Sequence, residues 1–86
     1  MKTIFKYQLE VRGDQLVTMP AGAQPLSVQV QHGAPCLWVL VDPTAGSHVY
    51  IVSTYGTGHP IPADPGKFVD TYQLEDGDLV FHVFVS

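Results

Sequence analysis

Apolar and polar residues alternate along most of this chain with a period of two, which is the period of a β-strand. In residues 4–11 every second residue is apolar, and Lys6, Gln8 and Glu10 stand between Phe5, Tyr7, Leu9 and Val11. Similar runs follow at residues 15–19, 26–31, 36–41, 47–55, 68–75 and 79–85. No ten-residue stretch shows a helical period. The pattern therefore predicts six or seven short strands.

Glycine and proline separate these runs. Arg12-Gly13-Asp14 is expected to form a tight turn with Gly13 at positive φ, after which 15–19 returns along the first strand. Asp76-Gly77 is the dipeptide best suited to a type I′ turn, so it is expected to join 68–75 and 79–85 in a closing hairpin. Short, regularly spaced strands predict a single all-β domain over residues 1–86, a small antiparallel β-barrel or sandwich of six to seven strands.

Two of the predicted strands, 36–41 and 79–85, are apolar on both faces. An antiparallel sheet tolerates this where the second face is also covered, so each is expected to lie at the centre of a closed barrel or at an oligomer seam. Hydrophobic residues make up 45% of the chain and charged residues 14%, against an average of about 25% charged. The excess of apolar residues predicts a homo-oligomer.

Charge and segment composition exclude several classes. Four Lys and Arg, scattered along the chain, stand against eight Asp and Glu, which argues against binding a nucleic-acid polymer. The first residues lack the apolar core of a signal peptide, and no apolar run approaches the ~20 residues that span a bilayer. A cytoplasmic protein without membrane attachment is expected. The single cysteine, Cys36, is expected to be a buried apolar side chain.

The segment from Tyr55 to Pro62 is the strongest candidate for a site. Glycines and prolines at Gly56, Gly58, Pro60, Pro62, Pro65 and Gly66 prevent regular structure over about ten residues. Connections of this length in compact domains are usually functional or disordered. The predicted ligand-binding residues are Tyr55, Gly56, Thr57, Gly58, His59 and Ile61.

Backbone donors are expected to recognise the ligand. Two glycines around Thr57 allow successive N–H groups to turn toward one point, which is the nest that holds phosphate or carboxylate oxygens. The Thr57 hydroxyl and the His59 ring would add to it. The alternative is that the glycines supply positive φ at a chain reversal and that His59 caps the turn.

Catalytic and metal sites are not predicted. His32, His48, His59 and His82 are dispersed without the spacing of a zinc site, and no cofactor motif is present. A nucleophile pair of Cys36 and His59 lacks an electropositive setting for the thiol. A small hydrolase using His59 with a carboxylate such as Asp64 remains the enzymatic alternative.

Several segments, in order over nearly the full length, resemble one family. They are Gly22-Ala23, 27–31, Pro35-Cys36-Leu37-Trp38, Gly56-Thr57-Gly58-His59-Pro60-Ile61 and 79–84. The family comprises small uncharacterised proteins of phages, prophages and bacteria and is a domain of unknown function. The resemblance implies that the Gly-Thr-Gly-His-Pro-Ile segment belongs to a family signature.

A phage context implies a counter-defence role in the host cell cytoplasm. In one form, a homo-oligomer sequesters a small anionic ligand such as a nucleotide-type signal, without catalysis. In the alternative, an accessory protein or interaction inhibitor covers a surface of a host defence protein. Its carboxylates would then face a basic partner: Asp14, Asp42, Asp64, Asp70, Glu75, Asp76 and Asp78.

Overall fold

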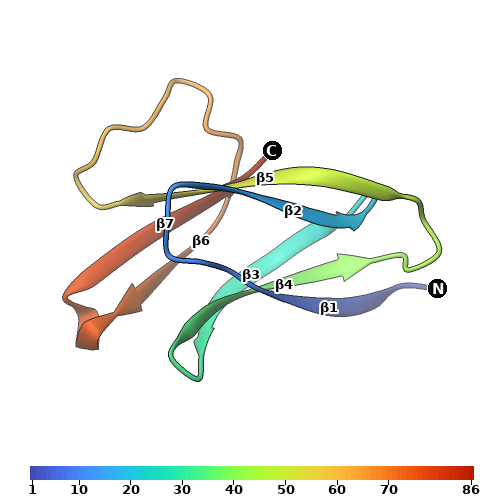
Figure 1. Cartoon of the computed structure of the whole chain (residues 1–86), viewed down its shortest axis with the longest axis horizontal. Helices are drawn as coiled ribbons and strands as arrows, with labels where there is room; N and C mark the ends of the chain where they lie inside the picture. Colours follow the sequence, from blue (N-terminus) through green and yellow to red (C-terminus); the bar gives the residue numbers. More distant parts are fainter.

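The computed structural model describes residues 1–86 as seven strands and one short 3₁₀ segment. These are β1 (Thr3–Gln8), β2 (Asp14–Pro20), β3 (Gln24–Gln31), β4 (Ala34–Val41), β5 (Ser47–Gly56), β6 (Lys67–Leu74), η1 (Glu75–Gly77) and β7 (Leu79–Val85). They form two antiparallel sheets with the strand orders β1-β4-β3 and β2-β5-β7-β6 (Figure 1). The all-β prediction is confirmed, and of its two forms the structure is the sandwich. No helix in it is long or apolar enough to cross a membrane.

The predicted hairpin between the first two strands is wrong. β1 pairs with β4 and β2 pairs with β5, so residues 9–13 carry the chain from one sheet to the other. Gly13 is not at positive φ, because this crossing does not need a tight reversal. Instead the buried Gln15 side chain fixes it, donating to the Glu10 carbonyl at 2.8 Å and accepting from the Glu10 N–H at 3.0 Å.

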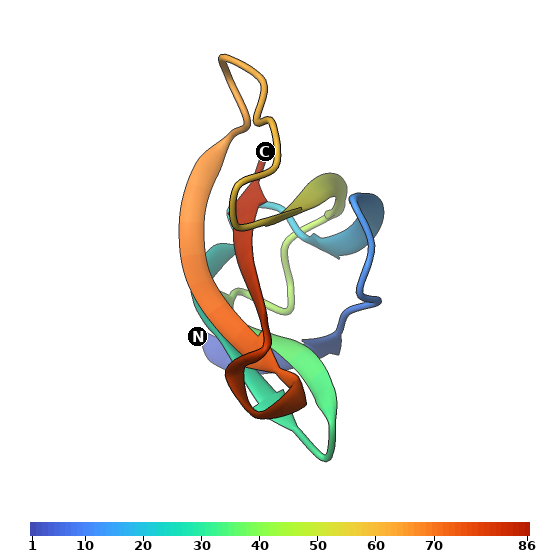
Figure 2. The ribbon, with the colours of Figure 1, turned by 90° about the vertical axis from the view of Figure 1, so that its left-hand side faces the viewer.

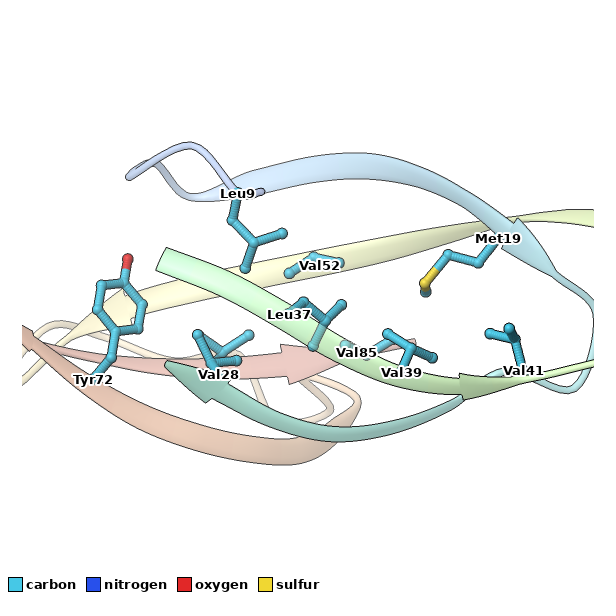
Figure 3. Packing of buried hydrophobic residues seen from close by; sticks show 10 residues of the cluster. Leu9, Met19, Val28, Leu37, Val39, Val41, Val52, Tyr72 and Val85 are labelled. Carbon is cyan, nitrogen blue, oxygen red and sulfur yellow. The ribbon is translucent and has the colours of Figure 1, made fainter. Parts of the chain in front are cut away.

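The core lies between the two sheets, and β4 contributes most to it. Leu37, Val39 and Val41 point inward with at most 1% of their surface exposed, against Met19, Val52, Val83 and Val85 of the other sheet (Figure 3). Because side chains alternate along a strand, these three residues share one face, but the sequence of this strand, apolar on both faces, does not show which face points inward. Burial of each such side chain stabilises the fold by about 1.5–3 kcal/mol.

The outward face of β4 is partly covered from within the chain. The Lys6 ammonium on β1 donates to Gln31 Oε1 on β3 at 2.7 Å and lies 5.7 Å from the centre of the Trp38 ring. This hydrogen bond joins the strands on either side of β4 at the level of Cys36, which is 2% exposed. The burial predicted for Cys36 is therefore confirmed. A closed barrel is not needed to explain the two apolar faces of this strand.

An aspartate links the two sheets where β3 lies beside β6. The Val28 N–H donates to Asp70 Oδ2 at 3.0 Å, and the Thr71 N–H donates to Asp70 Oδ1 at 2.9 Å. A β-bulge between Phe68 and Asp70 shifts the register of β6 at this point. Backbone pairing does not continue between these edges, so a carboxylate takes the place of the missing carbonyl acceptor.

The connection from β5 to β6 is the longest in the structure. Both strands are antiparallel to β7 and flank it, so they run parallel to each other, and residues 57–66 must return the whole length of a strand. The connection stands away from the strands in Figures 1 and 2. At the other end of β7 the predicted turn is confirmed: Asp76 and Gly77 have φ of 54° and 93°, and Asp78 N–H donates to the Glu75 carbonyl at 3.0 Å.

Candidate functional site

The Gly-Thr-Gly-His segment folds as a β-turn, and each glycine has a separate purpose. The His59 N–H donates to the Gly56 carbonyl at 3.1 Å, and Gly58 occupies the third position of the turn at φ +84°. The His59 ring lies against Gly56, since a Cβ at that position would be 3.1 Å from its Nδ1 and Cε1 atoms. Gly58 thus permits the reversal, and Gly56 makes room for the imidazole.

The predicted anion nest is not formed. Two of the backbone donors in this segment are used within the chain, because Thr57 N–H donates to the Val80 carbonyl at 3.1 Å and His59 N–H closes the turn. A nest needs successive N–H groups that are free and convergent. Recognition by this segment would therefore depend on its side chains.

A cleft of about 310 Å³ lies between the 9–13 crossing and this turn. We call it the Arg12–His59 cleft, and its lining residues are Val11, Arg12, Gly13, Thr54, Tyr55, Gly56, His59, Pro60 and Phe81. Arg12 Nε pairs with Glu10 Oε2 at 3.0 Å, which leaves the terminal amino groups of the guanidinium for a ligand. The Thr54 side-chain oxygen is buried and has no hydrogen-bond partner. The cleft thus presents two side chains that can donate hydrogen bonds, Arg12 and His59.

A second hollow, of about 250 Å³, lies on the other side of the same turn. Its lining includes Gly56, Thr57 and His59, together with Asp78, Leu79, Val80 and Phe81. The charged residue here is a carboxylate, whereas in the Arg12–His59 cleft it is a guanidinium. A guanidinium attracts an anion and a carboxylate repels it, so the Arg12–His59 cleft is the better anion site.

Thr57 contacts a histidine that sequence reasoning did not assign to the site. Its Oγ1 lies 2.7 Å from His82 Nε2, and Thr71 Oγ1 lies 2.9 Å from His82 Nδ1. His82 of β7 is paired with Tyr55 on β5 and Thr71 on β6, so all three side chains lie on the outer face of the sheet. The outward parity of His82, between inward Phe81 and Val83, was the available signal. The two threonines hold the ring in place.

The remaining predicted residues, Tyr55, Gly58 and Ile61, lie in different places. Tyr55 is half-buried, and its ring meets Phe84 edge to face at 5.8 Å between centroids. Gly58 and Ile61 are exposed and line neither hollow. The structure thus brings Tyr55, Gly56 and His59 to the cleft, turns Thr57 away from it, and adds Arg12 and Thr54.

The other histidines lie apart from the cleft. His48 stacks edge to face on Tyr50 at 4.8 Å between centroids, and His32 is exposed in a turn at φ 52°. No three His, Cys, Asp or Glu side chains gather in a metal-binding arrangement. The Thr44 hydroxyl, which donates to Asp42 Oδ1 at 2.7 Å, lowers the pKa of that carboxyl, as does a second bond from the Thr44 N–H.

Comparison with known proteins gives a family. No curated protein and no solved structure matches the chain. One family model, described as a domain of unknown function (DUF7352), matches residues 1–86. That match covers every strand described above, and the chain therefore belongs to the DUF7352 family.

Proposed function

We propose that this protein binds a small anionic ligand in the Arg12–His59 cleft and holds it without catalysis. One observation carries the proposal: the fold brings a guanidinium and an imidazole, distant in sequence, to the same hollow. Both side chains donate hydrogen bonds to phosphate or carboxylate oxygens, and guanidinium does so in a fork that fits two oxygens at once.

The lining also accommodates a ring beside the anionic group. Phe81 and Tyr55 offer aromatic surface. Ligand pockets have volumes of about 300–1,000 Å³, so a cleft of about 310 Å³ holds a small group. A phosphate with one attached ring, as in a nucleotide-type signal, suits this size better than a long polymer.

The biological role follows from the resemblance to phage and prophage proteins. A homo-oligomer that sequesters a nucleotide-type signal in the host cytoplasm would prevent a defence system from responding to it. The Gly56–Ile61 signature supports this role, because Gly56 allows the His59 ring to face the cleft. Binding without turnover is sufficient for sequestration.

The test is isothermal calorimetry with inorganic phosphate, mononucleotides and cyclic nucleotides. At least one should bind, and Arg12→Gln and His59→Ala should each weaken it roughly tenfold or more, the loss expected for a hydrogen bond to a charged group. Lys2→Gln, which removes an exposed cation outside the cleft, should leave the affinity unchanged.

Three outcomes would redirect the proposal. If no member of the panel binds, or if Lys2→Gln weakens binding as much as Arg12→Gln, the cleft is not an anion site. If the bound compound is consumed and the consumption stops in His59→Ala, the protein is a small hydrolase instead. The titrations give the first two results. Chromatography of the same samples afterwards shows whether the compound has been consumed.

The alternative function, covering a host defence protein, has one supporting observation. Glu75, Asp76 and Asp78 are exposed together at the tip of the β6–β7 hairpin, while Asp42 and Asp70 are engaged in hydrogen bonds. The acidic contact would therefore be this tip. This alternative predicts that the protein captures one basic host protein and that added salt weakens the binding. Replacing Glu75 by glutamine and Asp78 by asparagine should abolish it.

A further inference from the structure

The two outer faces of the sandwich differ in character. On the β1-β4-β3 sheet, polar side chains of the flanking strands surround the β4 residues: Lys6, Gln8, Ser27, Gln29 and Gln31. On the β2-β5-β7-β6 sheet, the outward positions mix polar residues with large apolar ones. The apolar ones are Leu16, Val49, Ile51, Tyr55, Phe68, Val80 and Phe84. The second face differs in exposing a group of large apolar side chains beside its polar ones.

We call this second surface the β5–β7 face. Its most exposed members are Leu16 at 72%, Val49 at 53%, Phe68 at 53% and Ile51 at 41%. The register places them side by side: Leu16 opposes Ile51 on β2 and β5, and Phe68 opposes Phe84 on β6 and β7. Exposed apolar residues therefore occur on all four strands, in two pairs offset by two residues along β5.

Aromatic contacts order the middle of this face. Phe84 meets Tyr55 at 5.8 Å and Phe68 at 5.4 Å, both edge to face. Ser53, opposite Phe84, is only 5% exposed, so neighbouring side chains cover it. Rings held by one another lose little freedom when a partner packs on them.

The face has the size of a small specific interface. Four strands at ~4.8 Å spacing and about seven residues at ~3.4 Å rise give roughly 20 Å by 24 Å. Two such faces in contact bury on the order of 900 Å² in projection, and more in accessible surface, against a requirement of about 1,000 Å². The molecule is also thin, 39 × 32 × 16 Å, so this is one of its two broad surfaces.

Charge favours a second copy of this chain as the occupant. Each molecule carries a formal charge of −4, and Asp14 at the start of β2 is the charged residue whose strand position faces this side. Two like-charged copies can approach closely only where carboxylates are scarce. A basic partner would gain nothing from an uncharged face and would be drawn to the acidic turn at Glu75–Asp78.

We infer that the protein forms a symmetric homodimer by packing the β5–β7 face against the same face of a second copy. Sheets pack face to face at ~10 Å, and a two-fold axis makes one surface its own complement. This deepens the oligomeric part of the proposed function. Tyr55 belongs both to the face and to the lining of the Arg12–His59 cleft, so the cleft opens at the rim of the dimer.

The test is sedimentation equilibrium over a range of concentrations. The wild type should give a mass twice the 9.4 kDa of the chain. Leu16→Glu places a carboxylate on the most exposed residue of the face and should raise the dimer dissociation constant at least tenfold. Ile4→Glu is the matched control, because Ile4 is 55% exposed on the outer face of the other sheet, and it should remain dimeric.

Trp38 provides a second readout. It is the only tryptophan and lies on the β4 side of the sandwich, so its fluorescence should not change when the wild-type dimer is diluted into monomers. Circular dichroism tests whether Leu16→Glu is folded, and Val49→Lys serves as the second variant of the face. Both should dissociate the dimer.

A wild type that stays monomeric at the highest concentration would overturn the inference, even if another protein is then found on this face. It would also be overturned if Ile4→Glu dissociates the dimer while Leu16→Glu does not, or if Trp38 fluorescence follows dissociation. Ligand titration of the folded Leu16→Glu monomer tests the two proposals separately. If the monomer still binds the ligand, binding in the Arg12–His59 cleft does not depend on the dimer.

Discussion

Tyr72 and Tyr50 show how differently two phenol groups serve the same fold. The Tyr50 hydroxyl accepts from the Ala23 N–H at 3.2 Å and donates to the Pro20 carbonyl at 3.4 Å. The Tyr72 hydroxyl is buried at one end of the core and has no hydrogen-bond partner (Figure 3). Tyr72 therefore contributes through its ring, which packs on Phe81 at 5.4 Å.

Replacing these tyrosines by phenylalanine should have opposite effects. Tyr72→Phe removes a buried unpaired hydroxyl, so the free energy of unfolding should stay the same or rise by about 1 kcal/mol. Tyr50→Phe removes both hydrogen bonds of its hydroxyl, although the Ala23 N–H keeps the Pro20 carbonyl as an acceptor at 3.2 Å, and should lower the free energy of unfolding by about 1 kcal/mol. Urea denaturation measures both, and a loss of stability in Tyr72→Phe comparable to that in Tyr50→Phe would contradict the assignment.

The loss of stability at alkaline pH provides a second, independent test of Tyr72. Desolvation by burial raises the pKa of Tyr72 above its usual 10.0, so the folded state holds the phenolic proton more tightly than the unfolded chain. Stability from this group is complete below pH 10.0 and is lost as the pH rises through the folded-state pKa. Tyr72→Phe should show a smaller alkaline loss than the wild type in denaturation curves recorded on both sides of that pH.

The alternation of apolar and polar residues predicted where the strands lie in the sequence far better than which strands pair with each other. All seven predicted strands exist, with ends that differ by at most three residues. The pattern is the same whether a strand turns back on its neighbour or crosses to another sheet, so the β1–β2 hairpin was predicted wrongly. At Gly13, sequence does not reveal φ, whereas Asp76-Gly77 is specific enough to predict its turn.

The Asp70 side chain that links the two sheets should contribute more to the free energy of unfolding than is usual for a partly exposed carboxylate. Asp70→Ala leaves the Val28 N–H without an acceptor at a buried residue and should lower the free energy of unfolding by about 1.5–3 kcal/mol. Asp64→Ala, which removes an exposed carboxylate from the 57–66 connection, should change it by less than ~0.5 kcal/mol. If the two variants unfold at the same denaturant concentration, the link does not stabilise the sandwich.

Gly66, where the long connection enters β6, should not tolerate a side chain. Its φ is +97°, and an added Cβ would lie 2.8 Å from the Val85 carbonyl oxygen. Strain and the backbone clash together should make Gly66→Ala less stable by at least ~2 kcal/mol. Gly13→Ala is the matched control, with no atom within 4 Å and no positive φ, and thermal unfolding should place it close to the wild type.

For the whole molecule, the candidate site could be predicted only in part. The glycines and prolines after Tyr55 mark an irregular segment, and three of the six residues predicted to bind a ligand do line the cleft. Arg12 and Thr54 could not be found, because their approach to His59 depends on the 9–13 crossing between sheets. The backbone nest failed for a related reason: the Val80 carbonyl that takes the Thr57 N–H belongs to a strand more than twenty residues away.

The position of β7 imposes an order on how the protein is made. This strand is the last in the sequence, yet it lies between β5 and β6, and Ser86 exchanges two backbone hydrogen bonds with Ile51 at 2.9 Å. All residues through β7 would have to leave the ribosome before the four-stranded sheet could close. Until then β5 and β6 present open edges to the cell, so the nascent chain passes through an aggregation-prone interval that the native state does not have.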